Sequence, residues 1–247
     1  MATRLHVGSK ELKGELSAYA KRFDLLEIRG VDAANLKQAP SAATLRKWRR
    51  AVPPRFEFAV VAGPNVGRLR PGDALDVELK ALLEAATLLE ARIVVVPTPV
   101  DVTPSKLSRD RFAKVLDRIP QDARTVVWEP SGLWETDDAA AQARKWGIVV
   151  AVDPTREEIP AGSTIYCRLR AQGVVRSFSA AALARVAHAI GDRKDAYVVI
   201  ETPGALREAK TLRQLVRGLA SSSKGGMSRL IRPRGAPLHV RDDEQDE

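Results

Sequence analysis

Short apolar segments that end in charged residues recur along the whole chain, and stretches with helical spacing separate most of them. Eight of these segments have the length and the β-branched content of strands: residues 5–8, 25–29, 56–61, 93–96, 125–129, 148–153, 165–170 and 197–201. Apolar residues recur every three or four positions between them, as in residues 75–86. Only residues 154–163 lack that period, so no full helix is expected after the sixth strand.

Strictly alternating strands and helices predict a parallel sheet with helices on its faces. The fully apolar segment 93–96 fits such a sheet, because parallel strands are buried on both faces. Eight strands predict a single-domain TIM (β/α)8 barrel with one helix shortened or missing after strand six. An open doubly wound sheet is the alternative, but such a sheet normally has fewer strands. Gly8 and Gly14, at the first strand–helix turn, also have the wrong spacing for a dinucleotide site.

The composition changes near Ser221, where a Ser- and Gly-rich stretch interrupts the apolar period and an acidic end follows. We therefore predict a barrel domain over residues 1–220 and a flexible tail over residues 221–247. Within the barrel, Ser41 and Ser108 are predicted to be the N-caps of the helices that follow them.

The formal net charge of +9 belongs to the barrel, because residues 221–247 contain five basic and five acidic side chains. Solvated helix faces account for this excess; the alternative is a non-catalytic scaffold that binds nucleic acid through a helix face, for example with Arg46, Arg49 and Arg50. An aromatic content of 5% argues against a surface that stacks single-stranded bases. Neither a signal peptide nor an apolar run of ~18 residues is present, so we expect a cytoplasmic protein without a membrane span.

Strand parity predicts where the chemistry lies. Alternate side chains of a barrel strand point to the interior, and the others point to the helix layer. If the apolar set faces the helices, the charged set faces inward at the carboxyl ends of the strands, where barrel enzymes keep their sites. The candidates are Glu27, Arg29, Glu129, Asp153, Arg168, Arg170 and Glu201.

Two roles are possible for these residues. Glu27, Glu129 and Asp153 are candidate catalytic carboxylates, as in a metal-independent glycosidase-type hydrolase. Arg29, Arg168, Arg170 and Glu201 are candidate ligand-binding residues, and the two strand-seven arginines suggest a phosphate or carboxylate site beside the helix that follows Pro203. The alternative is that the charges only neutralise one another, with Arg168 paired to Glu27 or Glu201.

Metal and thiol chemistry are not expected. The three histidines, His6, His188 and His239, lack metal-ligand spacing, and no cofactor is predicted. Cys167 is the only cysteine, so no intramolecular disulfide can form, and its parity places it on the helix side of the strand as a core residue.

Several segments, in order and spacing, resemble the domain of unknown function 72 family, also called YecE-like proteins, whose members are TIM barrels. The resemblance covers about residues 5–218 and rests on YAKRFDLLEIR at residues 19–29, VWEPS at residues 127–131 and YCRL at residues 166–169. The family's activity is unestablished, so the resemblance implies a fold and not a reaction.

The chain also departs from the family pattern. Glu27, Asp153 and Arg168 match it, whereas Arg29 stands for an Asn and Arg170 for a His. The Gly-, Trp- and Tyr-rich loop expected after the first strand is missing. We therefore expect the chain to be a divergent member of this family, whose ligand has changed or been lost. It would be an enzyme or a pseudo-enzyme that binds a small anionic or sugar-like molecule. The oligomeric state stays open.

Overall fold

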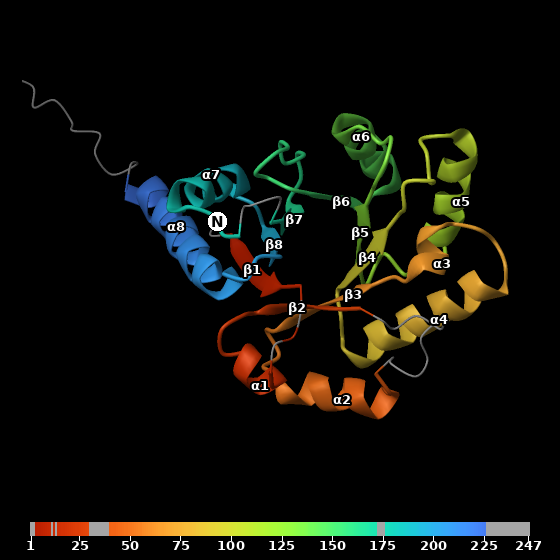
Figure 1. Ribbon diagram of the computed structural model, residues 1–247, viewed down its shortest axis with the longest axis horizontal. Helices are drawn as coiled ribbons and strands as arrows, with labels where there is room; N and C mark the ends of the chain where they lie inside the picture. Colours follow the sequence, from red (N-terminus) through yellow and green to blue (C-terminus); the bar gives the residue numbers. More distant parts are fainter. Residues whose placement is uncertain (1–2, 11, 13, 30–39, 172–175, 226–247) are drawn as a thin grey trace, which may run out of the picture.

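The computed structural model describes residues 3–10, 12, 14–29, 40–171 and 176–225. Eight parallel strands pair in sequence order and close into one barrel, because β1 pairs with both β2 and β8 (Figure 1). The strands are β1 (Arg4–Ser9), β2 (Leu25–Ile28), β3 (Glu57–Val61), β4 (Ile93–Pro97), β5 (Thr125–Glu129), β6 (Val149–Val152), β7 (Thr164–Leu169) and β8 (Asp195–Ile200). The closed barrel confirms the predicted fold and excludes the open sheet.

Eight helices in the described part of the chain surround the strands: α1 (Leu16–Tyr19), α2 (Ala42–Ala51), α3 (Pro64–Gly67), α4 (Asp73–Leu88), α5 (Lys106–Leu116), α6 (Thr136–Trp146), α7 (Ala180–Ile190) and α8 (Ala205–Gly225). The segment between β6 and β7 contains no helix, as predicted. There, a cavity of about 350 Å³ lies beside α6 and is lined by residues such as Val150 and Ile165.

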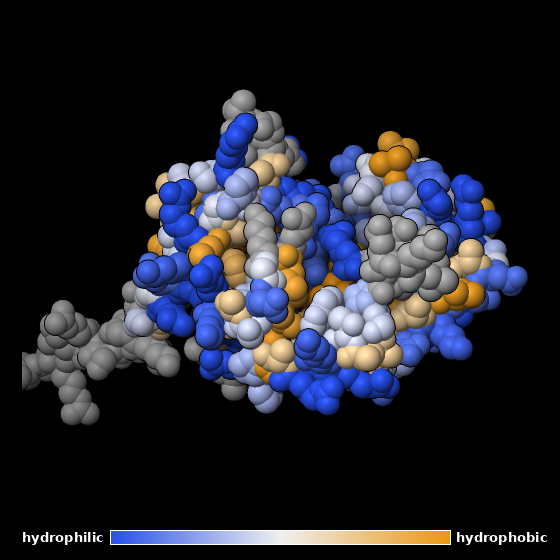
Figure 2. All heavy atoms as spheres, turned by 60° about the horizontal axis from the view of Figure 1, so that its bottom comes forward, coloured by the Kyte–Doolittle hydropathy of each residue, from blue (hydrophilic) through white to orange (hydrophobic). Residues whose placement is uncertain are grey.

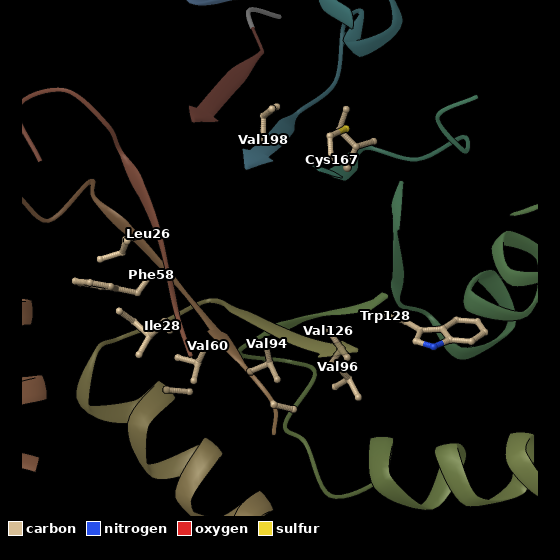
Figure 3. Packing of buried hydrophobic residues seen from close by; sticks show 14 of the residues in the cluster. Leu26, Ile28, Phe58, Val60, Val94, Val96, Val126, Trp128, Cys167 and Val198 are labelled. Carbon is tan, nitrogen blue, oxygen red and sulfur yellow. The ribbon is translucent and has the colours of Figure 1, made fainter. Parts of the chain in front are cut away.

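Hydrophilic side chains cover most of the visible outer face, and apolar ones show mainly in the gaps between them (Figure 2). Beneath that surface the buried residues form two clusters, as strand parity requires. The larger cluster lies between strands and helices and includes Leu26, Phe58 and Trp128, whose side chains point from the strands toward the helices (Figure 3). The smaller one fills the barrel interior and includes Leu25, Val127 and Tyr166. Cys167 lies in the outer cluster and is fully buried, as predicted.

Three local features differ from the sequence prediction. Residues 12–23, whose apolar residues follow helical spacing, are predicted to form the first helix, but α1 is only one turn long; Gly14, with a left-handed φ of 78°, prevents the helix from beginning at Leu12. Residues 65–72, which are polar and contain Gly and Pro, are predicted to be a loop after β3, but the short helix α3 occupies part of this segment. Ser105, not Ser108, is the N-cap of α5: its side chain accepts a hydrogen bond from the Ser108 amide at 3.2 Å. Ser41 caps α2 as predicted.

The last helix, α8, packs against α7 and crosses the boundary predicted at residue 220 (Figure 1). The rest of the predicted tail, residues 226–247, lies outside the described residues. Among the described helices, none combines the length and apolar character needed to cross a membrane.

Candidate functional site

All seven predicted site residues lie at the carboxyl ends of the barrel strands. Glu27, Glu129 and Arg168 belong to β2, β5 and β7, and the others directly follow β2, β6, β7 and β8. Leu25, Val127, Tyr166 and Val199, two residues before Glu27, Glu129, Arg168 and Glu201, all belong to the interior cluster. The side-chain alternation that buries these apolar groups therefore turns the charged groups into the barrel mouth.

The guanidinium of Arg168 is the hub of the mouth. Its two terminal nitrogens bind both carboxylate oxygens of Glu27, at 2.5 and 3.0 Å, and one of them also donates to Glu201 at 2.9 Å. Its Nε lies 3.0 Å from Glu129 Oε2. Three carboxylates from three different strand ends thus converge on one cation. Arg168 therefore pairs with both Glu27 and Glu201, the two partners that the sequence alternative named.

Glu27 is the most buried carboxylate of this group, with a side chain that is 0% exposed. It accepts hydrogen bonds from the Tyr166 hydroxyl at 2.5 Å and from Arg29 at 3.0 Å, besides those from Arg168. Burial alone would raise its pKa, but the attraction of Arg168 and Arg29, helped by these hydrogen bonds, lowers it. Glu27 therefore stays ionised, and burial raises the pKa of Tyr166 so that the hydroxyl keeps its proton.

The remaining groups form the rim of the mouth. Arg170 donates to Glu129, and Lys10 lies 3.5 Å from Glu201. The Asp153 carboxylate accepts from the amide and the hydroxyl of Thr155, at 3.0 and 2.7 Å, and so shapes its own loop. Four carboxylates, from Glu27, Glu129, Asp153 and Glu201, face four cations, from Lys10, Arg29, Arg168 and Arg170. The formal charges of the mouth balance.

The loops after β7 and β8, where barrels often bind phosphate, hold a carboxylate of the protein itself. Glu208, in the first turn of α8, is 1% exposed and accepts from the Phe178 amide at 2.8 Å and from the Thr202 hydroxyl. These two donors are therefore unavailable to an outside anion. An anion at the mouth has to bind the rim cations instead.

Two hollows flank the hub. A cavity of about 410 Å³ lies on the β1 and β8 side, lined by Lys10 and Glu201 together with the apolar faces of Tyr19, Phe23 and Leu206. A smaller one, of about 100 Å³, lies on the β5 to β7 side and is lined by residues that include Glu129, Asp153 and Arg170. Only the first reaches the 300–1,000 Å³ that is usual for small-molecule sites.

The opposite end of the barrel holds a second charged layer, which sequence reasoning did not identify. Arg92 binds the buried Glu57, Arg4 lies 2.7 Å from Asp195, and His6 stacks on Tyr197 with ring centroids 4.8 Å apart. These pairs lie at the amino ends of the strands and close the barrel floor. In the described part of the chain, no three His, Cys, Asp or Glu side chains are arranged to hold a metal ion.

Sequence reasoning also left two members of the mouth without a role. Tyr166 shares its strand face with Arg168, so parity was the signal that could have placed it beside Glu27. Lys10 follows the first strand and has no comparable signal, because its position depends on how the loop after β1 approaches β8.

Comparison with known proteins agrees with this geometry. A family model described as "Protein of unknown function DUF72" matches residues 6–233. A DUF72 family protein from Enterococcus faecalis is 14% identical, with a TM-score of 0.68 over 87% of this chain and 98% of the other. A DUF72 family protein from Thermotoga maritima is 17% identical, with a TM-score of 0.64 over 88% and 99%.

A protein from Salmonella typhimurium that contains a xylose isomerase domain is 14% identical, with a TM-score of 0.55 over 89% of this chain and 97% of the other. At these identities the solved structures establish a shared fold and nothing about the reaction. No curated protein matches the chain.

Proposed function

Since this chain belongs to the DUF72 family of unknown function, we propose its function from its own side chains: it binds a small anionic molecule at the barrel mouth. The observation that carries the proposal is that the cations of the charged cluster, apart from Arg168, are more exposed to solvent than its carboxylates. The side chains of Lys10, Arg29 and Arg170 are 46%, 40% and 43% exposed, whereas those of Glu27, Glu129 and Glu201 are 0%, 15% and 14% exposed.

This difference in solvent exposure predicts that the ligand carries a negative charge. Although the cluster is neutral as a whole, the carboxylates of Glu27, Glu129 and Glu201 contact Arg168, and the other cations reach into solvent. A molecule that enters the mouth meets the cations first. An anionic group can share them with the carboxylates at little desolvation cost, because the cations are still partly hydrated. A cationic ligand would find Glu27, Glu129 and Glu201 already bound to an arginine or a lysine.

The cavity of about 410 Å³ supports a definite kind of ligand. Lys10 provides a cation at one wall, Glu201 an acceptor beside it, and Tyr19, Phe23 and Leu206 an apolar surface. Most small-molecule sites combine apolar walls with a few polar groups in this way. We propose a carboxylate or phosphate on a sugar-sized body, with the anionic group at Lys10 and a hydroxyl at Glu201.

The proposal assigns binding and no reaction. Glu27, a candidate catalytic residue by sequence, is ionised and enclosed by four donors, so its part is to position Arg168 and not to donate a proton. Oδ1 of Asp153 accepts two hydrogen bonds from Thr155 in its own loop, and Oδ2 lies 3.5 Å from the Arg170 amide that donates to it. If the protein turns a ligand over, Glu129 is the candidate acid or base that borders a hollow.

Calorimetric titration tests the proposal with a panel of carboxylates, inorganic phosphate and sugar phosphates. Lys10→Ala should weaken binding of a panel member about 10- to 100-fold, the usual loss for one hydrogen bond to a charged group, whereas Arg170→Ala should have a smaller effect, because Arg170 borders only the smaller hollow. Lys80→Ala on the outside of α4 is the matched control, because Lys80 is also exposed and lies outside the mouth. If neither mouth variant differs from this control, or if no panel member binds, the proposal is wrong.

A further inference from the structure

A broad open groove of about 1100 Å³ runs along the outer face of α8, and cations dominate its lining. We call it the α8 groove. Its cations are Lys21, Arg22, Arg176, Arg207, Lys210, Arg213 and Arg217, and no carboxylate lines it. The side of the molecule that carries α8 also shows a dense group of hydrophilic side chains, at the left of Figure 2. The groove adjoins the 410 Å³ cavity, since Arg22, Pro203 and Leu206 border both, but of its seven cations only Arg22 also lines that cavity.

The helix presents its groove residues as a stripe. Arg207, Lys210, Gln214 and Arg217 are spaced three, four and three residues apart, so they lie on one face of α8. At a rise of about 1.5 Å per residue the stripe is ~15 Å long. Lys21 and Arg22, which follow α1, and Arg176, which precedes α7, add cations from two other parts of the chain.

Most of these cations are not used by the fold. Arg213 is the exception: it donates to the Val7 and Arg22 carbonyls and binds Asp24 at 2.9 Å. The other six are exposed, and none has a carboxylate within ion-pair distance among the residues that the structure describes. Cations this close together repel one another and destabilise the folded state. A bound polyanion would neutralise them and remove this repulsion, which no carboxylate of the described residues offsets for these six side chains.

The side chains that line the groove indicate which kind of polyanion it binds. Guanidinium and ammonium groups in a row match the repeated phosphates of a nucleic-acid backbone. Proteins that hold single strands add aromatic side chains on which bases stack, and the groove has none. We propose that the α8 groove binds the phosphodiester backbone of duplex nucleic acid, without contacts that read the base sequence.

This surface differs from the helix face that the sequence suggested. On α2, the Arg49 side chain is only 11% exposed and donates to the Phe56 and Pro53 carbonyls at 3.0 and 2.6 Å, so it is part of the fold. Arg46, Lys47 and Arg50 remain exposed on that helix. They provide a matched control with the same number of cations on a different face.

The test measures binding of a 20-base-pair DNA duplex, and of the RNA duplex of the same sequence, by fluorescence anisotropy at several salt concentrations. The α8 variant is Arg207→Glu, Lys210→Glu and Arg217→Glu combined, and the α2 control is Arg46→Glu, Lys47→Glu and Arg50→Glu combined. A second α8 variant with Gln at the three positions serves if the Glu variant does not fold, which circular dichroism reports.

Loss of three phosphate contacts should reduce the slope of log K against log salt by about 2.7 and weaken binding at least about 10-fold, whereas the α2 control should bind as the wild type does. The DNA and RNA arms identify the preferred duplex. Equal losses in the two triple variants would overturn the proposal, because net charge alone would explain them. It would equally be overturned if neither duplex bound at ~50 mM salt.

Discussion

Removal of the Glu27 carboxylate is the perturbation that tests the hub most directly. Glu27→Ala leaves Arg168, 1% exposed, without the partner that binds two of its nitrogens, and it leaves the buried Tyr166 hydroxyl without an acceptor. Breaking a buried ion pair from one side typically costs about 3–5 kcal/mol, since the remaining charge stays buried. Glu129 and Glu201 still neutralise Arg168, so we expect a loss of about 3 kcal/mol in the free energy of unfolding.

Glu201→Ala is the matched control. It also removes a carboxylate from Arg168, but this carboxylate is 14% exposed and makes one hydrogen bond to the guanidinium, and Glu27 remains in place. We expect a loss of about 1 kcal/mol, as for a partly exposed pair. Glu27→Met combined with Arg168→Met should cost less than the sum of the two single changes, because neither charge is then left alone in the interior.

Urea unfolding followed by circular dichroism measures all five variants, the two single Met changes included, and an unchanged m-value would show that the unfolded state is comparable. In a thermal scan, a loss of about 3 kcal/mol corresponds to a Tm lowered by roughly 6–12 °C for a chain of this size. If Glu27→Ala costs no more than Glu201→Ala, the burial of the Glu27–Arg168 pair does not control stability, and the reasoning fails.

The lowered pKa of Glu27 also fixes a pH dependence. The stability that this group contributes is complete above the ordinary glutamate pKa of 4.5 and is lost as the pH falls from there toward the lower folded pKa. Glu27→Gln should therefore lose less stability than the wild type between about pH 4.5 and pH 3. Equal losses over that range would contradict the ionised state that we assign to Glu27.

Three further expectations concern other parts of the barrel. Burial lowers the pKa of His6, which stacks on Tyr197, so its contribution is complete above the ordinary pKa of 6.5 and is lost below it; His6→Phe should flatten the urea-derived stability curve between pH 6.5 and 5. Burial raises the pKa of Cys167 to about 12, so a thiol reagent at pH 8 should modify it only in urea; rapid labelling of the folded protein would contradict this burial. A Cβ on Gly8 would lie 2.2 Å from the Leu25 carbonyl oxygen, so Gly8→Ala should cost about 1–3 kcal/mol in urea unfolding, and an unchanged midpoint would show that the strands can move apart.

The fold was predictable because each strand of this chain repeats the same local signal. A run such as residues 93–96 is apolar throughout, and the flanking stretches have helical spacing, so element type followed from periodicity alone. The gap after β6 was predictable for the same reason, since residues 154–163 lack the period. Helix ends were harder: Ser105 and Ser108 have the same capping chemistry three residues apart, and only the backbone geometry decides that Ser105 is the cap.

Inward orientation of the charged residues was likewise predictable, but their partners were not. Parity placed Glu27 and Arg168 on interior faces, and the closed barrel brings them together although 141 residues separate them. Whether Arg168 would meet a ligand or a carboxylate depends on strand stagger and side-chain reach, which a single sequence does not encode locally. The position of the Glu208 carboxylate between the loops after β7 and β8 could not be predicted either. A glutamate in the first turn of a helix is usually explained by its favourable interaction with the helix dipole alone.

The balance of charge within the mouth connects the two proposals. Because four carboxylates and four cations meet at the strand ends, the mouth contributes nothing to the formal net charge of +9. The excess must lie elsewhere on the protein, and the α8 groove holds six cations without a carboxylate partner among the described residues. A small anion at the mouth exchanges one partner for another within a neutral network, so its affinity should depend weakly on salt. A duplex in the groove releases counterions, so its affinity should fall steeply with salt. The salt dependence of a bound anion therefore identifies which of the two surfaces holds it, before any side chain is changed.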